Sequence, residues 1–293
     1  MSQCLFTVTC DRDRWSFLQQ YYSVNKFVKP CKWYIVVNEI DESEWMKWFK
    51  RNKENSPHNI QIIPLRRYLW PLHPDVQEYI KSQSGYWRQL YLKLLIHLHC
   101  KEKRIVVLDS KNWIAKRCEL SDFPQQARKP KEGTVFYGTI DFFEKHWNIE
   151  TPYITDNITP HILHKKTLQK MWKEFNNENT GIMYLKNQNF KSIGPTHHQS
   201  GFLAEFFMYD IFCQKKGLHQ NIVRDGSNEC LYAWFDPSKF EDKNKFVEWF
   251  EYKNLKFPPL SVTIKWYVED EGGSLSETHR QQLLDILMRD SDK

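Results

Sequence analysis

The residues best placed for chemistry are an acid and a lysine that close an uninterrupted apolar run, Val106-Val107-Leu108-Asp109-Ser110-Lys111. A short apolar run predicts a buried strand, and a carboxylate at the end of such a strand is held in a fixed position. There it can accept a hydrogen bond from a hydroxyl group or bind a divalent metal ion. The alternative is that Asp109 only caps the turn or helix after the strand.

Two polar residues upstream of this strand have a spacing that places them on one face of a helix. Gln89 and Lys93 are four residues apart in a stretch, 85–99, whose apolar residues recur with helical periodicity. Side chains four apart lie on the same side of a helix, so both can point into one pocket. Each can instead be an ordinary solvated residue.

A single acid, Glu205, stands in an otherwise apolar helical stretch, 201–215. A buried carboxylate needs either a partner or a chemical role. Glu205 is therefore our first candidate for a catalytic base, and an ion pair with a lysine or arginine is the alternative. Asp210 is the second candidate base and Asp156 a weaker third.

Two adjacent histidines, His197 and His198, follow Gly194-Pro195-Thr196. Neighbouring loop residues can reach the same ligand, which can be a metal ion or a substrate. No third ligand follows at the spacing of a zinc site. The adjacent pair of histidines therefore favours a loop that contacts a substrate over a metal site.

The elements that must position these residues alternate between strand and helix. Apolar runs at 5–9, 33–37, 60–64 and 104–108 predict strands, and amphipathic stretches at 15–27, 42–53 and 85–99 predict helices, with a proline-rich loop through Pro71 and Pro74. Such an alternation predicts a mostly parallel sheet with helices on both faces. Ligands bind at the carboxyl ends of the strands in these sheets, which here carry the polar clusters 10–13, 38–39 and 109–112.

Beyond residue 125 the pattern becomes mixed. We expect strands at 134–137 and 260–266, an irregular segment at 153–163, and helices at 168–175, 201–215 and 276–288. We interpret the chain as one domain, 1–293, with a ligand-binding half at 1–125, a second half at 126–270 and a terminal helix within 271–293.

Composition excludes several classes of protein. The 293 residues carry a net charge of +6, from 42 basic and 36 acidic residues spread along the chain, so sequence-specific nucleic-acid binding is not indicated. The seven cysteines stand singly, which fits neither a zinc ribbon nor a disulfide framework. No apolar run is long enough to span a bilayer. We expect a cytoplasmic protein whose membrane contacts, if it has any, are peripheral.

Aromatic residues are abundant, with 12 Trp, 14 Tyr and 19 Phe. Most are expected in the core, and the remainder in a cleft where flat rings stack on sugars or bases.

The order and spacing of these motifs resemble those of the GT-A glycosyltransferases. Arg104 to Asp109 is similar to the strand that bears their Asp-x-Asp motif, with Lys111 where the second Asp would stand. Residues 85–94 resemble their Gly-x-x-x-Gln-x-x-x-Lys-Leu helix, Thr7 to Asp13 their first strand and loop, and 36–39 their second strand. The sequence 158–161 resembles an acceptor-side Thr-Pro segment, and Glu205 lies in a stretch similar to a segment of some bacterial and viral glycosyltransferase-like families.

The resemblance implies a GT-A-like, Rossmann-related α/β fold and two sets of binding residues. The expected donor-binding residues are Thr9, Asp11, Asp13, Asn38, Gln89, Lys93, Asp109, Ser110, Lys111 and Lys265. The expected acceptor-binding residues are His161, His197 and His198. The resemblance also implies a metal, Mn²⁺ or Mg²⁺, at Asp109. Because Lys111 replaces an acid, its ammonium group can instead take the place of the metal's charge.

We therefore expect transfer of a sugar from a nucleotide-sugar donor, such as a UDP-sugar, to an acceptor hydroxyl. Inversion and retention are both compatible with the sequence, and Lys111 favours a reaction without a metal. Two alternatives stay open. One is a catalytically degenerate GT-A fold that serves as a binding scaffold, which the missing second Asp favours. The other is a metal-dependent nuclease or phosphotransferase that uses Asp109 with Asp11, Asp13 and Glu39.

Overall fold

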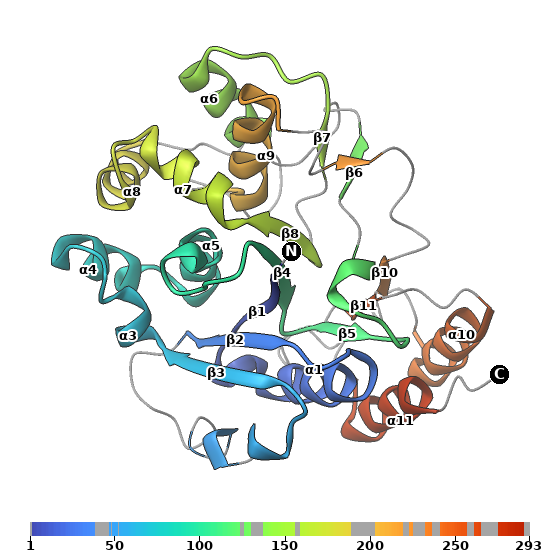
Figure 1. Cartoon of the computed structure of the whole chain (residues 1–293). Coiled ribbons are helices and arrows are strands. Elements are labelled where there is room, and N and C mark those ends of the chain that lie inside the picture. The colour runs from blue at the N-terminus through green and yellow to red at the C-terminus, as the bar shows by residue number, and fades with distance from the viewer. Residues whose placement is uncertain are drawn as a thin grey trace.

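The computed structural model is built around a five-stranded sheet in the order β3-β2-β1-β4-β8 (Figure 1). It describes residues 2–38, 47, 49–51, 53–123, 126–129, 137–155, 159–188, 203–218, 223–224, 232–235, 241–256, 261–264 and 275–289. The sheet comprises β1 (Gln3–Thr9), β2 (Lys32–Val37), β3 (Asn59–Pro64), β4 (Arg104–Asp109) and β8 (His161–His164). The first four strands are parallel and β8 is antiparallel to β4, which confirms the expected mostly parallel sheet.

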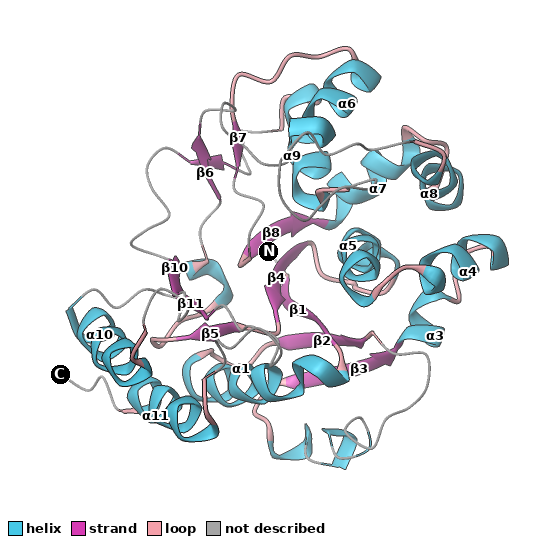
Figure 2. Cartoon of the chain, turned by 180° about the vertical axis from the view of Figure 1, so that it is seen from behind, coloured by secondary structure: helices cyan, strands magenta, loops and turns pink. Residues whose placement is uncertain are grey.

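Helices cover both faces of this sheet, as Figure 2 shows from behind. Successive side chains of a strand point to opposite faces. Accordingly Leu5 packs in a core cluster with α1 (Arg14–Phe27), whereas Phe6 packs in another cluster with α3 (Leu65–Leu69) and α5 (Gly85–Leu95). The continuous apolar runs of the sequence are therefore strands that are buried on both sides.

The expected loop through Pro71 and Pro74 is shorter than predicted: Pro71 lies in the turn at 70–73, but Pro74 does not belong to the loop. Two short helices, α3 and α4 (Pro74–Ser82), occupy this region, and Pro74 is the first residue of α4. Proline is favoured at the first helical position because its missing N–H has no partner there in any case. The imidazole of His73 accepts from the Asp75 N–H and caps the helix.

The remaining helices gather mainly on the side of β8 and at the C-terminal end (Figure 1). They are α6 (Tyr137–Trp147), α7 (Lys165–Lys173), α8 (Glu178–Lys186), α9 (Glu205–Lys215), α10 (Lys243–Lys256) and α11 (Glu277–Met288). Short 3-10 helices are η1 (Asp11–Asp13), η2 (Lys53–Asn55), η3 (Ile96–Leu98) and η4 (Leu120–Asp122). Tyr137 begins α6 rather than ending a strand, and 134–136 lie outside the described residues. Residues 47 and 49–51 are helical, as expected, but the rest of the predicted helix up to residue 52 is outside the description.

Two small sheets complete the fold and confirm its mixed second half. One has the order β10-β11-β5 and the other β7-β6-β9. Their strands are β5 (Asn112–Ile114), β6 (Gln126–Lys129), β7 (Ile154–Thr155), β9 (Val223–Arg224), β10 (Tyr232–Phe235) and β11 (Ser261–Ile264). No helix in the described part of the chain is both long and apolar enough to cross a bilayer.

Candidate functional site

The candidate site lies where the strand order of the large sheet reverses. The chain continues from β1 to β2 on one side, and β4 pairs with the other side of β1. The strand ends are aligned, since Thr9 pairs with Val37 and Val8 pairs with Asp109. In open α/β sheets the crevice at such a switch point is the usual ligand site. The structure therefore places Thr9, Asn38 and Asp109 at this edge, as the sequence predicted.

A buried ion cluster lies directly behind the end of β4. The Lys93 Nζ is 2.8 Å from Asp109 Oδ1 and 3.0 Å from Glu205 Oε1. Lys93 is 3% exposed and Glu205 1%, so one ammonium group joins α5, β4 and the first turn of α9 out of contact with water. Two residues predicted separately for the donor site, Lys93 and Asp109, are thus brought together. Glu205 has the lysine partner that was one of its two alternatives.

Burial and opposite charge compete in setting the protonation of this cluster. Burial acts to lower the pKa of Lys93, but the carboxylates of Asp109 and Glu205 outweigh it and raise that pKa above its ordinary value. Burial acts to raise the pKa of Asp109, but Lys93, and to a lesser extent Lys111, bring it below the usual range. For Glu205 burial prevails over Lys93, and its pKa is raised. Lys93 and Asp109 are therefore both charged at neutral pH.

An aromatic ring and an imidazole flank the cluster. The Lys93 Nζ lies 5.2 Å from the centroid of the Phe206 ring, a cation–π distance. On β8, the His161 ring stacks on Phe206 with centroids 3.9 Å apart. His161, an expected acceptor-side residue, is thus adjacent to the cluster through Phe206.

Side chains from distant parts of the sequence fix the turn after β4. Asn112 Oδ1 accepts from the Asp109 N–H at 2.6 Å, and Ser110 Oγ donates to the Val8 carbonyl at 3.1 Å. Gln20 Nε2 on α1 donates to the Asp109 carbonyl at 2.5 Å and to the Asn112 carbonyl at 3.0 Å. The hydrogen bonds hold the backbone of the Asp109 turn in one conformation. Sequence reasoning missed Gln20, whose only signal is a glutamine on the buried side of a helix.

The end of β2 is joined to the start of α5. Asn38 Nδ2 donates to the Gly85 carbonyl at 2.8 Å, and Arg88 donates to Asn38 Oδ1 at 3.3 Å. Arg88 also donates to the carbonyls of Lys81 and Gln83 at 2.9 and 3.0 Å. Arg88 is not among the residues predicted for the site, although it precedes Gln89 in the motif. Its role here is to hold the entry to α5 against the strand end.

For the other predicted donor residues, the structure gives no contact with the Lys93–Asp109 pair. Gln89 and Lys111 are half-buried, Asp11 is exposed on η1, and the Asp13 carboxylate lies 3.8 Å from the Arg12 guanidinium. The following predictions lie outside the described residues: Glu39, Asp156, His197, His198 and Lys265.

Asp210 does not join the Lys93 cluster. It lies five residues beyond Glu205, which turns it by about 140° around the helix. Its Oδ2 accepts from the Thr155 N–H of β7 at 2.9 Å, and the side chain is buried. Burial raises its pKa to about 7, against the opposing effect of the Thr155 hydrogen bonds.

The described residues do not fit a divalent metal ion. One oxygen of Asp109, Oδ1, is in contact with the Lys93 ammonium, and a lysine, Lys111, stands where the second acid of the motif would be. Among the residues that the structure describes, no three of the types His, Cys, Asp and Glu lie together as a metal site. A divalent cation at Asp109 would thus lie close to two lysines, Lys93 and Lys111, and Lys93 already neutralises part of the carboxylate charge.

Two solved structures share this arrangement of elements. The bifunctional glycosyltransferase WbbM superimposes with a TM-score of 0.52 and 12% identity, over 99% of this chain and 50% of WbbM. Mouse xyloside xylosyltransferase 1 superimposes with a TM-score of 0.50 and 10% sequence identity, over 94% of this chain and 100% of that protein. The fold is that of a GT-A glycosyltransferase.

The GT-A fold and the fold class expected from the sequence are thereby confirmed. This chain spans half the length of WbbM. No protein-family model and no curated protein sequence matches it. A fold of this kind can host several functions, so the fold alone does not establish the reaction.

Proposed function

We propose that this GT-A chain transfers a sugar from a nucleotide-sugar donor to an acceptor hydroxyl, and that it does so without a divalent metal. The observation that carries the proposal is the Asp109 carboxylate, fixed at the switch point of the sheet by Lys93 and followed by Lys111. A fixed carboxylate beside a fixed cation suits a donor with hydroxyl groups and a diphosphate.

Lys111, Asp109 and Lys93 each have a distinct task in this reaction. Negative charge develops on the diphosphate as the sugar leaves, and a fixed positive charge stabilises it. Lys111 is near enough to lower the pKa of Asp109, and we assign this role to it. Asp109 accepts a hydrogen bond from a donor hydroxyl, and Lys93 positions Asp109. Thr9, Asp11, Asp13, Asn38, Gln89, Ser110 and Lys265 complete the proposed donor site.

Glu205 is the proposed base that deprotonates the acceptor hydroxyl. Its Oε2 has no hydrogen-bond partner among the described residues, and its raised pKa brings it toward the pH at which a base works best. Its Oε1 is held by Lys93, so the same residue also positions the cluster. Asp210 is the second candidate, with His161, His197 and His198 on the acceptor side.

Metal-free binding is tested by thermal denaturation with UDP, GDP and CMP, each with Mn²⁺ and with EDTA. At least one nucleotide is expected to stabilise the fold equally in both conditions, by about 2.7 kcal/mol at a hundred times its Kd. Lys111→Met should reduce this stabilisation, whereas Lys170→Met on the exposed side of α7 should leave it unchanged. Stabilisation that requires Mn²⁺ would contradict metal independence. If no nucleotide stabilises the protein, the scaffold alternative is favoured.

Transfer activity is tested with a panel of sugar nucleotides and the variants Asp109→Ala and Glu205→Gln. Each is expected to lower kcat/KM by about a hundred-fold or more, because each removes a charge from the reacting site. If Glu205 is the base, Glu205→Gln should lower kcat and remove the acidic limb of the pH profile of the reaction. If Glu205 only positions the cluster, the variant should also bind the donor more weakly. Asp285→Ala, an exposed acid on α11, is the control. Full activity in both variants would refute the site assignment.

A further inference from the structure

A fully buried asparagine, Asn112, is hydrogen-bonded to both sides of the candidate site. It is the first residue of β5, directly after the turn that carries Asp109. Its Oδ1 accepts from the Asp109 N–H at 2.6 Å, and its Nδ2 donates to the carbonyl of Thr159, just before β8, at 3.2 Å. One amide group therefore joins the donor-side turn to a residue 47 positions further along the chain.

The side chain of Thr159 makes a second link between the same two segments. It is buried, and it hydrogen-bonds to the Asp109 side chain. Burial acts to raise the pKa of Asp109, and the Thr159 hydrogen bond adds to the effect of Lys93 in bringing that pKa below the usual range. Thr159 is thus held to the Asp109 turn through its backbone carbonyl and through its hydroxyl.

The residues that follow Thr159 lie against the Lys93 cluster. His161 stacks on Phe206 with the two ring planes 9° apart, and Phe206 comes directly after Glu205 on α9. The segment 159–161 therefore reaches from the Asp109 carboxylate to the ring beside the proposed base. Asn112 anchors the start of this segment, and Phe206 contacts its end.

The two contacts of Asn112 require an acceptor and a donor in one side chain. The Asp109 N–H needs an acceptor and the Thr159 carbonyl needs a donor, and an asparagine amide offers both in a single plane, whereas an ionised aspartate of the same shape only accepts. The backbone of Asn112 is itself fixed, because Gln20 Nε2 donates to its carbonyl at 3.0 Å and the residue pairs with Thr263 of β11. The amide is therefore a fixed spacer between the two segments.

We propose that Asn112 is a positioning residue of the transfer reaction, which sets the place of the acceptor-side segment 159–161 relative to the Asp109 carboxylate. Because its side chain is fully buried, it acts through Asp109 and Thr159 and touches no substrate. This inference rests on the proposed transferase function. It adds that a single amide group aligns the donor and acceptor sides of the site.

Loss of the contact with Thr159 should affect the acceptor more than the donor. The Asp109 turn has further anchors, because Gln20 donates to the Asp109 carbonyl and Ser110 donates to the Val8 carbonyl. The segment 159–161 would lose its hydrogen bond to the β5 side of the site, so the acceptor would meet a less fixed surface.

The test compares Asn112→Asp and Asn112→Ala with wild type at pH 8. The Kd is measured for whichever of UDP, GDP and CMP binds, and the acceptor KM is measured with a panel of p-nitrophenyl glycosides. Neither variant can donate to the Thr159 carbonyl, so both should raise the acceptor KM by about three- to ten-fold, the effect of one lost hydrogen bond. Asn112→Asp keeps an acceptor for the Asp109 N–H and should leave the nucleotide Kd unchanged, whereas Asn112→Ala should raise it.

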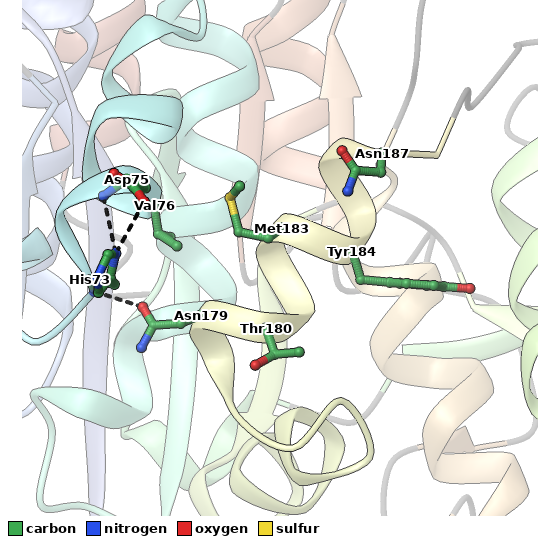
Figure 3. A pocket seen from close by; sticks show the side chains of 8 residues that line it. All are labelled: His73, Asp75, Val76, Asn179, Thr180, Met183, Tyr184 and Asn187. Carbon is green, nitrogen blue, oxygen red and sulfur yellow. Dashed lines mark hydrogen bonds and ion pairs between the residues drawn. The ribbon is translucent and has the colours of Figure 1, made fainter.

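Asn179→Asp is the matched control, because the Oδ1 of Asn179 also accepts from a backbone N–H, that of His73 at 2.7 Å. The two residues lie in a hollow of about 470 Å³ between α4 and α8, where Figure 3 shows their contact. None of the residues that line this hollow belongs to the candidate site. The control should match wild type in the acceptor KM and in the nucleotide Kd.

Hydrogen exchange followed by mass spectrometry tests the link between the segments without turnover. Both Asn112 variants should exchange about three- to ten-fold faster than wild type in peptides that cover 159–164, because a lost hydrogen bond lowers the local free energy of opening. Asn179→Asp should exchange there as wild type does. Melting curves check that each variant folds.

The positioning role and the transferase function fail separately. An acceptor KM and an exchange rate at 159–164 that equal those of wild type in both Asn112 variants would overturn the positioning role. A nucleotide Kd raised equally in both variants, with the acceptor KM unchanged, would also overturn it, because Asn112 would then serve the donor turn alone. If wild type transfers no sugar, the proposed function is contradicted, and the exchange rates alone uphold or overturn the link between the two segments.

Discussion

Replacing Lys93 by methionine is expected to lower the free energy of unfolding at pH 7 by about 3–5 kcal/mol, the usual cost of removing one partner of a buried ion pair. Methionine retains the apolar stem of the lysine but leaves two carboxylates, Asp109 and the 1% exposed Glu205, without their counter-ion. Urea denaturation followed by tryptophan fluorescence measures the change. Lys170→Met on exposed α7 should alter stability by less than about 0.5 kcal/mol.

The double variant Lys93→Met/Glu205→Met separates loss of the charge pair from loss of packing. Apolar residues of similar size often replace a buried ion pair without net cost, so the double variant should be more stable than Lys93→Met alone. The single variant should also be least destabilised at acidic pH. Removing Lys93 lets burial raise the pKa of Glu205 further, and protonation then removes the unpaired charge. A single variant as stable as wild type at pH 7 and 8 would contradict the importance of the cluster.

The strands and the site edge could be predicted because both follow from local patterns. Apolar runs of four or five residues gave β1, β2, β3 and β4, and the polar residues after them lie at one edge because parallel strands end together. Gln89 and Lys93 were selected by helical spacing, and Lys93 indeed reaches Asp109.

Contacts between distant segments could not be predicted in the same way. Lys93 and Glu205 are 112 residues apart, and Gln20 and Asp109 are 89 residues apart. Periodicity shows that Glu205 is buried, but it does not show which cation will meet it. The same limit explains Asp210, which belongs to the same apolar helix yet meets the Thr155 backbone rather than the ion cluster.

The substitution Asp210→Asn is expected to reduce the loss of stability that the protein shows as the pH rises from 4 to 7. In an unfolded chain this carboxyl ionises near its ordinary pKa of 3.8, whereas burial raises the pKa in the folded protein to about 7. Between these values the folded state holds a proton that the unfolded state has released, so the contribution of Asp210 to stability falls as the pH rises. Above pH 7 the loss is complete, and three pKa units correspond to at most about 4 kcal/mol.

Asparagine removes this titration while its amide oxygen can still accept from the Thr155 N–H. The variant should match wild type near pH 4 and become progressively more stable than wild type up to pH 8, in urea denaturation at each pH. The difference between the two curves isolates Asp210, because every other titrating group is common to both. Asp285→Asn on exposed α11 should follow wild type throughout. Parallel curves for wild type and Asp210→Asn would show that Asp210 is ionised in the folded protein, which would require a cation or donor beyond the Thr155 contact.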